Sequence, residues 1–112
     1  MEIVTEESFS PVIPVQKVDS LDEAIKMSNA TKYGLGCTIF TRDIERAMNA
    51  ADKIKSGTVC INSPLMENIA APFGGMKQSG IGREHGIEAL DEFREAKHIY
   101  IDYEHSKKNW WF

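Results

Sequence analysis

Residues 37–62, CTIFTRDIERAMNAADKIKSGTVCIN, decide the fold, because they predict a strand, a helix and a second strand in close succession. The opening CTIFT is rich in β-branched and aromatic side chains, and TVCIN at residues 58–62 is a continuous apolar run of the kind that a parallel sheet buries on both faces. The helix between them is capped by Thr41 or Asp43, and Gly57 follows it as a C-cap. Its buried stripe is expected to consist of Ile44, Ala47, Met48, Ala51 and Ile54.

The residues before this stretch predict one more helix and one more extended segment. Ser20 and Glu23 have the spacing of a capping box, so a helix is expected to begin at Leu21 and to end near residues 29–31. PVIPVQKV at residues 11–18 is expected to be extended, and its two prolines confine it to a sheet edge or to the start of a strand.

The residues after this stretch predict a long loop, a helix and a last strand. Residues 63–82 show no helix or strand period, and loops of this length in compact domains tend to be functional or disordered. A helix is expected over about residues 83–93, a strand over residues 97–103 and a tail over residues 104–112. The side chains of that helix expected to point inward are Ile87, Leu90 and Phe93.

This order of elements predicts the fold class. Strand, helix, strand, helix, strand at short spacing is typical of an α/β domain with right-handed crossovers, so we expect one domain over residues 1–112 with a partial, Rossmann-like parallel sheet and flanking helices. Such sheets bind ligands outside the carboxyl ends of their strands. The ligand side is therefore expected at the turns around Gly34 and Asn62 and at the glycine-rich loop that follows.

Composition and charge exclude several classes of function. Thirteen Lys and Arg residues against 17 Asp and Glu give a net charge of −4 and a pI of about 5.3, so we expect no nucleic-acid partner. No stretch approaches the roughly 18 apolar residues that span a bilayer, and residues 1–10 are acidic rather than basic, so a cytoplasmic protein without a membrane partner is expected. Cys37 and Cys60 lack metal-ligand spacing and fit a reducing compartment.

The chemistry of single residues identifies no active site. The spacing of Gly80, Gly82 and Gly86 is close to the dinucleotide-binding motif G-x-G-x-x-G. The third glycine, however, falls one residue late for that motif, and no predicted strand directly precedes the first. We therefore reject that interpretation, because the glycines need only let the chain turn tightly before the helix. Cys37 and Cys60 lie in predicted strands and are expected to be inert thiols, and the three histidines share no spacing that would hold a metal ion.

Four ordered blocks nevertheless resemble one enzyme family. The chain from about Glu6 to Asp102 is similar to the C-terminal part of the NAD(P)-dependent aldehyde dehydrogenases. The blocks are EESFSPV at residues 6–12, YGL at residues 33–35, GTVCIN at residues 57–62 and PFGGMKQSGIGRE at residues 72–84. Only the Trp110-Trp111-Phe112 tail stays unassigned by this resemblance.

The resemblance implies a role for five residues. Glu7 matches a glutamate that holds the hydroxyls of the nicotinamide-side ribose, and a carboxylate suits a ribose diol because it accepts two hydrogen bonds at once. Phe9 and Leu35 match contacts beside the nicotinamide. Phe73 matches a residue near the aldehyde pocket, and Glu84 matches a carboxylate that relays protons to the general base. As plain structure, Phe73 would be a loop anchor and Glu84 a first-turn acid favoured by the helix dipole.

The chain also departs from the family. Ser10 stands where the family usually has glycine, so the turn that presents Glu7 and Phe9 is expected to be altered. The nucleophilic cysteine, the general base, the oxyanion asparagine and the dinucleotide-binding domain would all lie upstream of Met1, and neither Cys37 nor Cys60 matches the nucleophile. We therefore expect a truncated relative that is inactive alone and binds neither NAD nor NADP tightly.

Two other functions stay open at this stage. The segment 97–103 matches the strand with which these enzymes dock onto a neighbouring subunit, so the chain could be an assembly or regulatory module that forms a homo-oligomer or pairs with a full-length aldehyde dehydrogenase. It could also be one half of an enzyme that is split across two chains.

Overall fold

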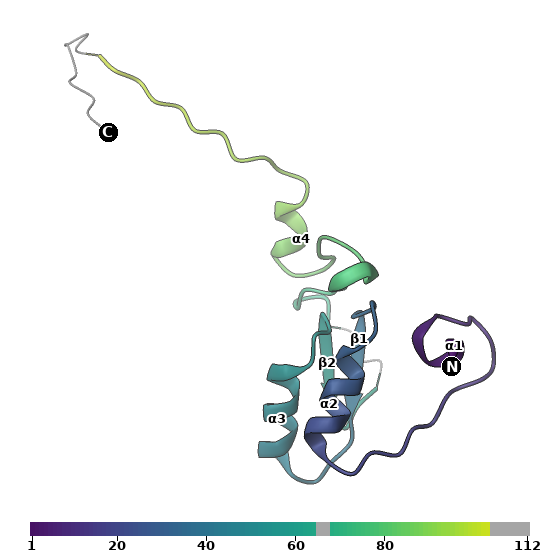
Figure 1. Cartoon of the computed structure of the whole chain (residues 1–112). Coiled ribbons are helices and arrows are strands. Elements are labelled where there is room, and N and C mark those ends of the chain that lie inside the picture. Colours follow the sequence, from purple (N-terminus) through teal and green to yellow (C-terminus); the bar gives the residue numbers. More distant parts are fainter. Residues whose placement is uncertain (65–67, 104–112) are drawn as a thin grey trace, which may run out of the picture.

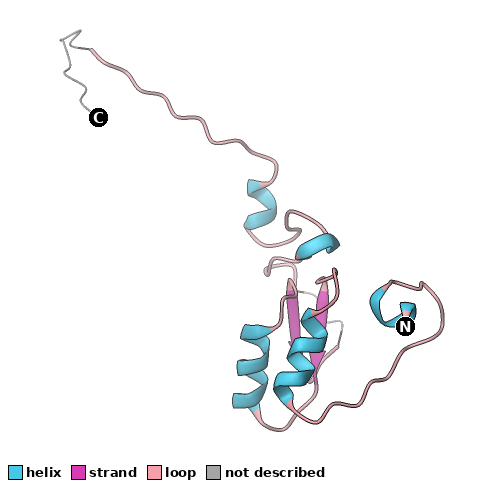
Figure 2. Ribbon diagram, in the orientation of Figure 1, coloured by secondary structure: helices cyan, strands magenta, loops and turns pink. Residues whose placement is uncertain are grey.

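Two parallel strands and two helices beside them form the body of the protein, in a computed structural model that describes residues 1–64 and 68–103 (Figure 1, Figure 2). The radius of gyration is 21.5 Å, whereas a compact domain of this length has about 13 Å. The difference arises because stretches at both ends of the described chain extend from the body (Figure 1). The elements are α1 (Glu2–Thr5), α2 (Leu21–Asn29), β1 (Gly36–Ile39), α3 (Ile44–Lys53), β2 (Thr58–Ile61), the 3₁₀ turn η1 (Lys77–Ser79) and α4 (Glu88–Asp91).

The central strand–helix–strand unit confirms the predicted α/β class. β1 and β2 pair in parallel, from Gly36 opposite Thr58 to Ile39 opposite Ile61. α3 begins as predicted, because the Asp43 side chain accepts a hydrogen bond of 3.0 Å from the backbone N–H of Arg46. α2 packs against α3, and both helices lie on one side of the two strands (Figure 1).

The second helix also begins where the sequence predicts. In α2, Ser20 Oγ accepts a hydrogen bond of 3.1 Å from the N–H of Glu23, and the Glu23 carboxylate accepts one of 2.9 Å from the N–H of Asp19. At the other end of α2, the Asn29 side chain donates to the Lys53 carbonyl at 2.8 Å and accepts from the Lys55 N–H at 2.7 Å. One side chain therefore joins the ends of both helices.

The predicted stripe of α3 is only partly buried. Ala47 is buried as expected and Ala50, which was not expected, is buried too, whereas Ile44 and Met48 are 63% and 52% exposed. A sheet of two strands is too narrow to cover a wider stripe. The same narrowness leaves all four residues of β2 half-buried, so the expectation that this strand is buried on both faces is wrong in this chain.

Gly57 is not a C-cap. α3 ends at Lys53, and Ile54 already has an extended backbone with φ −76° and ψ 128°. A close backbone contact explains why glycine stands at this position. A Cβ at position 57 would overlap the carbonyl oxygen of Gly74 and lie 2.7 Å from its carbonyl carbon. Gly57 thus permits a close approach of two backbone segments.

The predictions for the C-terminal third are wrong in part. The helix expected over residues 83–93 shortens to α4, because His85 and Gly86 take left-handed φ values of 62° and 63° that no right-handed helix contains. The residues expected to point inward are exposed, namely Ile87, Leu90 and Phe93.

The strands expected at residues 11–18 and 97–103 do not form within the described part of the chain, where β1 and β2 make the sheet. A strand needs a hydrogen-bonded partner, and the C-terminal segment runs away from the body (Figure 1). Ile99, Ile101 and Tyr103 are consequently 70%, 59% and 84% exposed. The predicted tail at residues 104–112 lies outside the described residues.

Candidate functional site

The glycine-rich segment crosses from one end of the sheet to the other. After β2 the chain leaves at Asn62, on the carboxyl side, yet Met76 returns to the amino ends of the strands, where its N–H donates to the Gly34 carbonyl at 2.8 Å. The same carbonyl accepts from the Gly57 N–H at 3.0 Å, and Ser79 Oγ accepts from the Gly34 N–H at 2.9 Å. The turn at Gly34 and the glycine-rich loop therefore meet, but they meet at the amino ends of the strands, so the expectation that both lie at the carboxyl ends is wrong.

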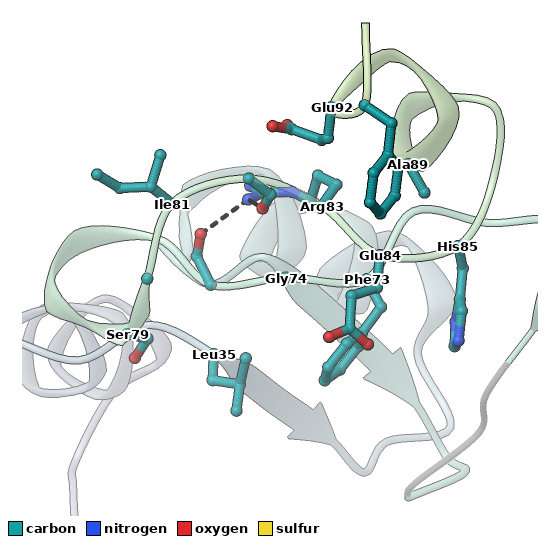
Figure 3. Close-up of a pocket in the computed structure, with 14 residues that line it drawn as sticks. Leu35, Phe73, Gly74, Ser79, Ile81, Arg83, Glu84, His85, Ala89 and Glu92 are labelled. Atoms are coloured by element: carbon teal, nitrogen blue, oxygen red, sulfur yellow. Dashed lines mark hydrogen bonds between the residues drawn. The ribbon is translucent and has the colours of Figure 1, made fainter.

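A cavity of about 570 Å³ lies at this meeting point (Figure 3). Leu35 lines it from the start of β1, and Phe73, Glu84 and His85 line it from the glycine-rich segment. Phe73 and Glu84 are fixed opposite each other, because each backbone N–H donates to the other's carbonyl at 2.7 Å. Three of the five residues that the family resemblance singles out are thus brought together.

The side chains of the glycine-rich segment form a wall of two aromatic rings with a carboxylate beside it. Figure 3 shows Phe73, Glu84 and His85 directed to the same side of the segment. The Phe73 and His85 rings lie 6.4 Å apart between centroids and are tilted by 38°. Glu84 is exposed, so its carboxylate is in contact with water.

Arg83 holds the wall in place. Its guanidinium donates hydrogen bonds of 2.9 Å to the Gly75 carbonyl and 2.7 Å to the Gly82 carbonyl (Figure 3). Because a Cβ at Gly74 would lie 2.8 Å from Arg83 Cδ, the glycine also makes room for this side chain. The sequence reasoning missed Arg83, because a side chain that donates to backbone carbonyls leaves no pattern in the sequence.

Glu7 and Phe9 lie outside the cavity. Phe9 is 93% exposed, and Glu7 lines a separate hollow beside α1. Within the described residues the Glu7 carboxylate forms no hydrogen bond or ion pair, so it is free to accept two hydroxyl groups. The structure does not bring these two residues together with Leu35, Phe73 and Glu84.

The turn around Phe9 accommodates Ser10 in an ordinary backbone conformation. The left-handed residue is Phe9, with φ 47°, whereas Ser10 has an ordinary φ and needs no glycine. The hydroxyls of Ser8 and Ser10 are 3.0 Å apart and hydrogen-bond across the turn. Serine at position 10 therefore supports this turn rather than straining it.

The two cysteines lie away from the cavity. Cys37 pairs with Val59 and Thr38 with Cys60, and because paired residues share a face of the sheet, the two thiols point to opposite faces. Both are free and half-buried. Desolvation and the neighbouring Cys60 raise the pKa of Cys37, which disfavours the thiolate that a nucleophile requires. Among the described residues, no cluster of His, Cys, Asp and Glu could hold a metal ion.

Alkaline pH is expected to destabilise the chain through Cys37. Its pKa in the folded chain lies above the usual 9.0, so the unfolded chain loses the thiol proton first. The stabilisation is fully present below the unfolded pKa and is lost as the pH rises through the folded pKa. The fall in the free energy of unfolding can be measured by urea unfolding at about pH 8 and about pH 10. In Cys37→Ala, the part of this fall that comes from the Cys37 thiol should be absent. An equal loss in both proteins would contradict the assignment to Cys37.

Comparisons with known proteins agree with this geometry. The sequence profile of the aldehyde dehydrogenase family matches residues 1–99. Mitochondrial 10-formyltetrahydrofolate dehydrogenase of Mus musculus is 44% identical over 105 residues, which are 92% of this chain and 11% of that protein. Aldehyde dehydrogenase [NAD(P)+] 1 of Saccharomyces cerevisiae is 43% identical over 101 residues, which are 90% of this chain and 20% of that protein.

Solved structures give the same result. A variant of betaine aldehyde dehydrogenase from Staphylococcus aureus superposes with a TM-score of 0.91 and 44% identity, over 99% of this chain and 22% of that one. The NAD+ complex of an aldehyde dehydrogenase from Bacillus cereus superposes with a TM-score of 0.86 and 47% identity, over 93% of this chain and 21% of that one. The chain thus spans about a tenth to a fifth of the length of these relatives. By sequence and by structure, the chain belongs to the aldehyde dehydrogenase family.

Proposed function

We propose that this chain is the C-terminal segment of an aldehyde dehydrogenase catalytic domain and that it supplies contacts to the nicotinamide and one wall of the aldehyde pocket. The observation that carries the proposal is the cavity in which Leu35, Phe73 and Glu84 meet, since these residues are far apart in the sequence. By the family resemblance they match a nicotinamide-side contact, a residue near the aldehyde pocket and a relay carboxylate.

Three residues have side chains that are suited to contacts with a nicotinamide cofactor. The free Glu7 carboxylate would hold the two hydroxyls of the nicotinamide-side ribose, and the exposed Phe9 ring would cover the ribose and the nicotinamide. Leu35, 45% exposed at the mouth of the cavity, would add an apolar contact. The cofactor, NAD or NADP, would accept the hydride from the substrate.

The chain alone is proposed to be inactive. Aldehyde oxidation by this family requires a thiolate, donors for the oxyanion and a positioned nicotinamide. Cys37 and Cys60 are the two cysteines of the sequence, and neither lines the cavity. Glu84 would serve as a proton relay to a general base that another segment provides.

A chimeric enzyme tests the proposal. The segment of the Staphylococcus aureus betaine aldehyde dehydrogenase that superposes on this chain is replaced by the chain itself. We expect aldehyde-dependent formation of NADH by the chimera and none by the chain alone. Turnover by the pure chain would contradict its inactivity, and a folded but inactive chimera would contradict the proposed role of the segment.

Glu7→Gln in the chimera tests the cofactor contact. The substitution replaces the carboxylate that would accept hydrogen bonds from the ribose hydroxyls with a neutral amide. Because hydrogen bonds to charged groups contribute about 1.5–3 kcal/mol, the KM for NAD is expected to rise about 10- to 100-fold. Asp52→Asn, on the exposed side of α3, is the matched control and should leave the KM unchanged. Equal KM values for both variants would remove Glu7 from the cofactor site.

A second function, assembly, is favoured by the apolar segment at residues 97–103. Its exposed Ile99, Ile101 and Tyr103 need a cover, and an extended segment gains one by pairing with a sheet edge. A second copy of the chain or an aldehyde dehydrogenase subunit would offer such an edge. Light scattering at several concentrations should then show a defined oligomer, and a monomer at every concentration would exclude self-assembly.

The proposed setting is the cytoplasm. Within the described residues, no helix has the length and apolar character that a bilayer crossing requires. Because the net charge is −4 and binding to phosphates needs clustered Lys and Arg, the proposed function includes no nucleic-acid partner.

A further inference from the structure

Lys32 lies between the two separated parts of the candidate site. Its backbone belongs to the part that forms the cavity, because its carbonyl accepts a hydrogen bond of 3.0 Å from the Gln78 N–H. The neighbouring Thr31 carbonyl accepts one of 2.9 Å from the ammonium of Lys77, which also donates to the Asn29 carbonyl at 3.2 Å. The base of the Lys32 side chain is therefore fixed to the glycine-rich segment.

The other end of the same side chain reaches the N-terminal part. Lys32 Nζ lies 2.6 Å from Glu6 Oε2, and these two residues are 26 positions apart in the sequence. The hydrogen bond to Glu6 raises the pKa of Lys32, so the ammonium stays charged throughout the neutral range. The ammonium also lies 5.4 Å from the centre of the Tyr33 ring, which attracts a cation.

Glu6 is the last residue before the turn at residues 7–10, which the proposed function assigns to the cofactor. Its N–H closes α1 by donating to the Glu2 carbonyl at 2.8 Å, and Glu7 follows directly. The turn itself holds its shape through the hydroxyls of Ser8 and Ser10 and the left-handed Phe9. A contact that fixes Glu6 consequently fixes where Glu7 and Phe9 stand relative to the cavity.

We propose that Lys32 is a positioning residue, whose ion pair with Glu6 limits where the Glu7–Ser10 turn can lie relative to the cavity that contains Leu35 and Phe73. The proposal rests on the proposed function, because it assigns the turn to the nicotinamide-side ribose. Lys32 itself touches neither cofactor nor substrate. Its expected influence is small, since the side chains of Lys32 and Glu6 are 41% and 47% exposed and exposed ion pairs are partly screened by water.

The test compares chimeras that carry Lys32→Met, Glu6→Gln, both substitutions together, or Lys32→Arg. Each of the first two is expected to raise the KM for NAD about two- to fivefold and to leave kcat within about twofold. The double variant should be no worse than either single one, because the two residues act as one pair. Lys32→Arg should restore the original KM, and Lys26→Met, an exposed lysine of α2, is the control.

Salt separates positioning by charge from a merely structural role. Raising the ionic strength from about 0.02 M to about 0.5 M should increase the KM of the unsubstituted chimera by the same factor as Lys32→Met, and should leave the Lys32→Met chimera unchanged. An inactive chimera overturns the proposed function and with it the role of Lys32. An active chimera whose KM is the same with and without Lys32 overturns the role of Lys32 alone.

Discussion

Replacing Gly57 with alanine is expected to prevent the glycine-rich segment from packing on the sheet. The new Cβ would overlap the Gly74 carbonyl oxygen, and it would lie 2.7 Å from the Gly74 carbonyl carbon and 3.4 Å from the Gly75 Cα. These are backbone atoms, so no side-chain rotation relieves the overlap. Overpacking usually lowers the free energy of unfolding by about 1–3 kcal/mol, and we expect Gly57→Ala to lie at or above the upper end of this range.

The loss should be visible in urea unfolding of the chain. The buried hydrophobic residues in the described part of the chain are Ile25, Ala47 and Ala50, so a loss of about 3 kcal/mol is a large part of the stability of so small a core. The midpoint should fall sharply or the cooperative transition should disappear. In the chimera the same substitution should abolish turnover, since the cavity cannot form.

Gly36→Ala is the matched control. Gly36 also stands at the amino end of the sheet, but no atom lies within 4 Å of a Cβ built there and its φ is an ordinary one. Removing the freedom of a glycine in the unfolded chain should stabilise the protein by about 0.4–1 kcal/mol. If both variants lost the same stability, backbone crowding at Gly57 would not be the cause.

The parts of the fold that could be predicted from sequence are those that local rules determine. The Ser20 and Asp43 caps fixed where α2 and α3 begin, and the apolar TVCIN run fixed β2. These signals act within a few residues, so they hold whatever the rest of the protein does.

The parts that could not be predicted depend on contacts between distant segments. The residues around Gly57 do not show whether this glycine caps a helix or allows two backbone segments to approach. The answer depends on Gly74, which packs against Gly57 in the folded chain. The strand expected at residues 97–103 needs a partner that the described residues do not contain. Likewise, the cavity lies at the amino ends of the strands because the glycine-rich segment returns there after Asn62.

The candidate site shows the same division. The blocks of sequence similarity identified Leu35, Phe73 and Glu84, which the cavity unites. The sequence did not identify Lys32 or Arg83. The partner of Lys32 is a carboxylate 26 residues away and the partners of Arg83 are two backbone carbonyls, and neither kind of contact leaves a sequence pattern.

Arg83→Met is expected to open the cavity wall. The half-buried guanidinium satisfies the carbonyls of Gly75 and Gly82, and methionine keeps most of the apolar stem but donates no hydrogen bond. Gly75 is itself buried, so water cannot easily replace the lost donor. Leaving buried acceptors unsatisfied costs about 1–3 kcal/mol, and we expect a loss of about 2–3 kcal/mol in urea unfolding.

Two further substitutions decide whether the paired hydrogen bonds are the cause. Arg83→Lys keeps the charge, but its ammonium ends a shorter side chain and lacks the planar Nη1 that donates to both carbonyls, so it should lose an intermediate amount of stability. Arg94→Met removes an arginine whose ion pair with Asp91 is exposed, with side chains 68% and 67% accessible, and should change stability by less than about 0.5 kcal/mol. Equal losses for Arg83→Met and Arg94→Met would mean that charge alone matters. Loss at Arg83 with partial recovery by lysine instead identifies the bond between Arg83 and the glycine carbonyls as what keeps Phe73 and Glu84 facing one cavity.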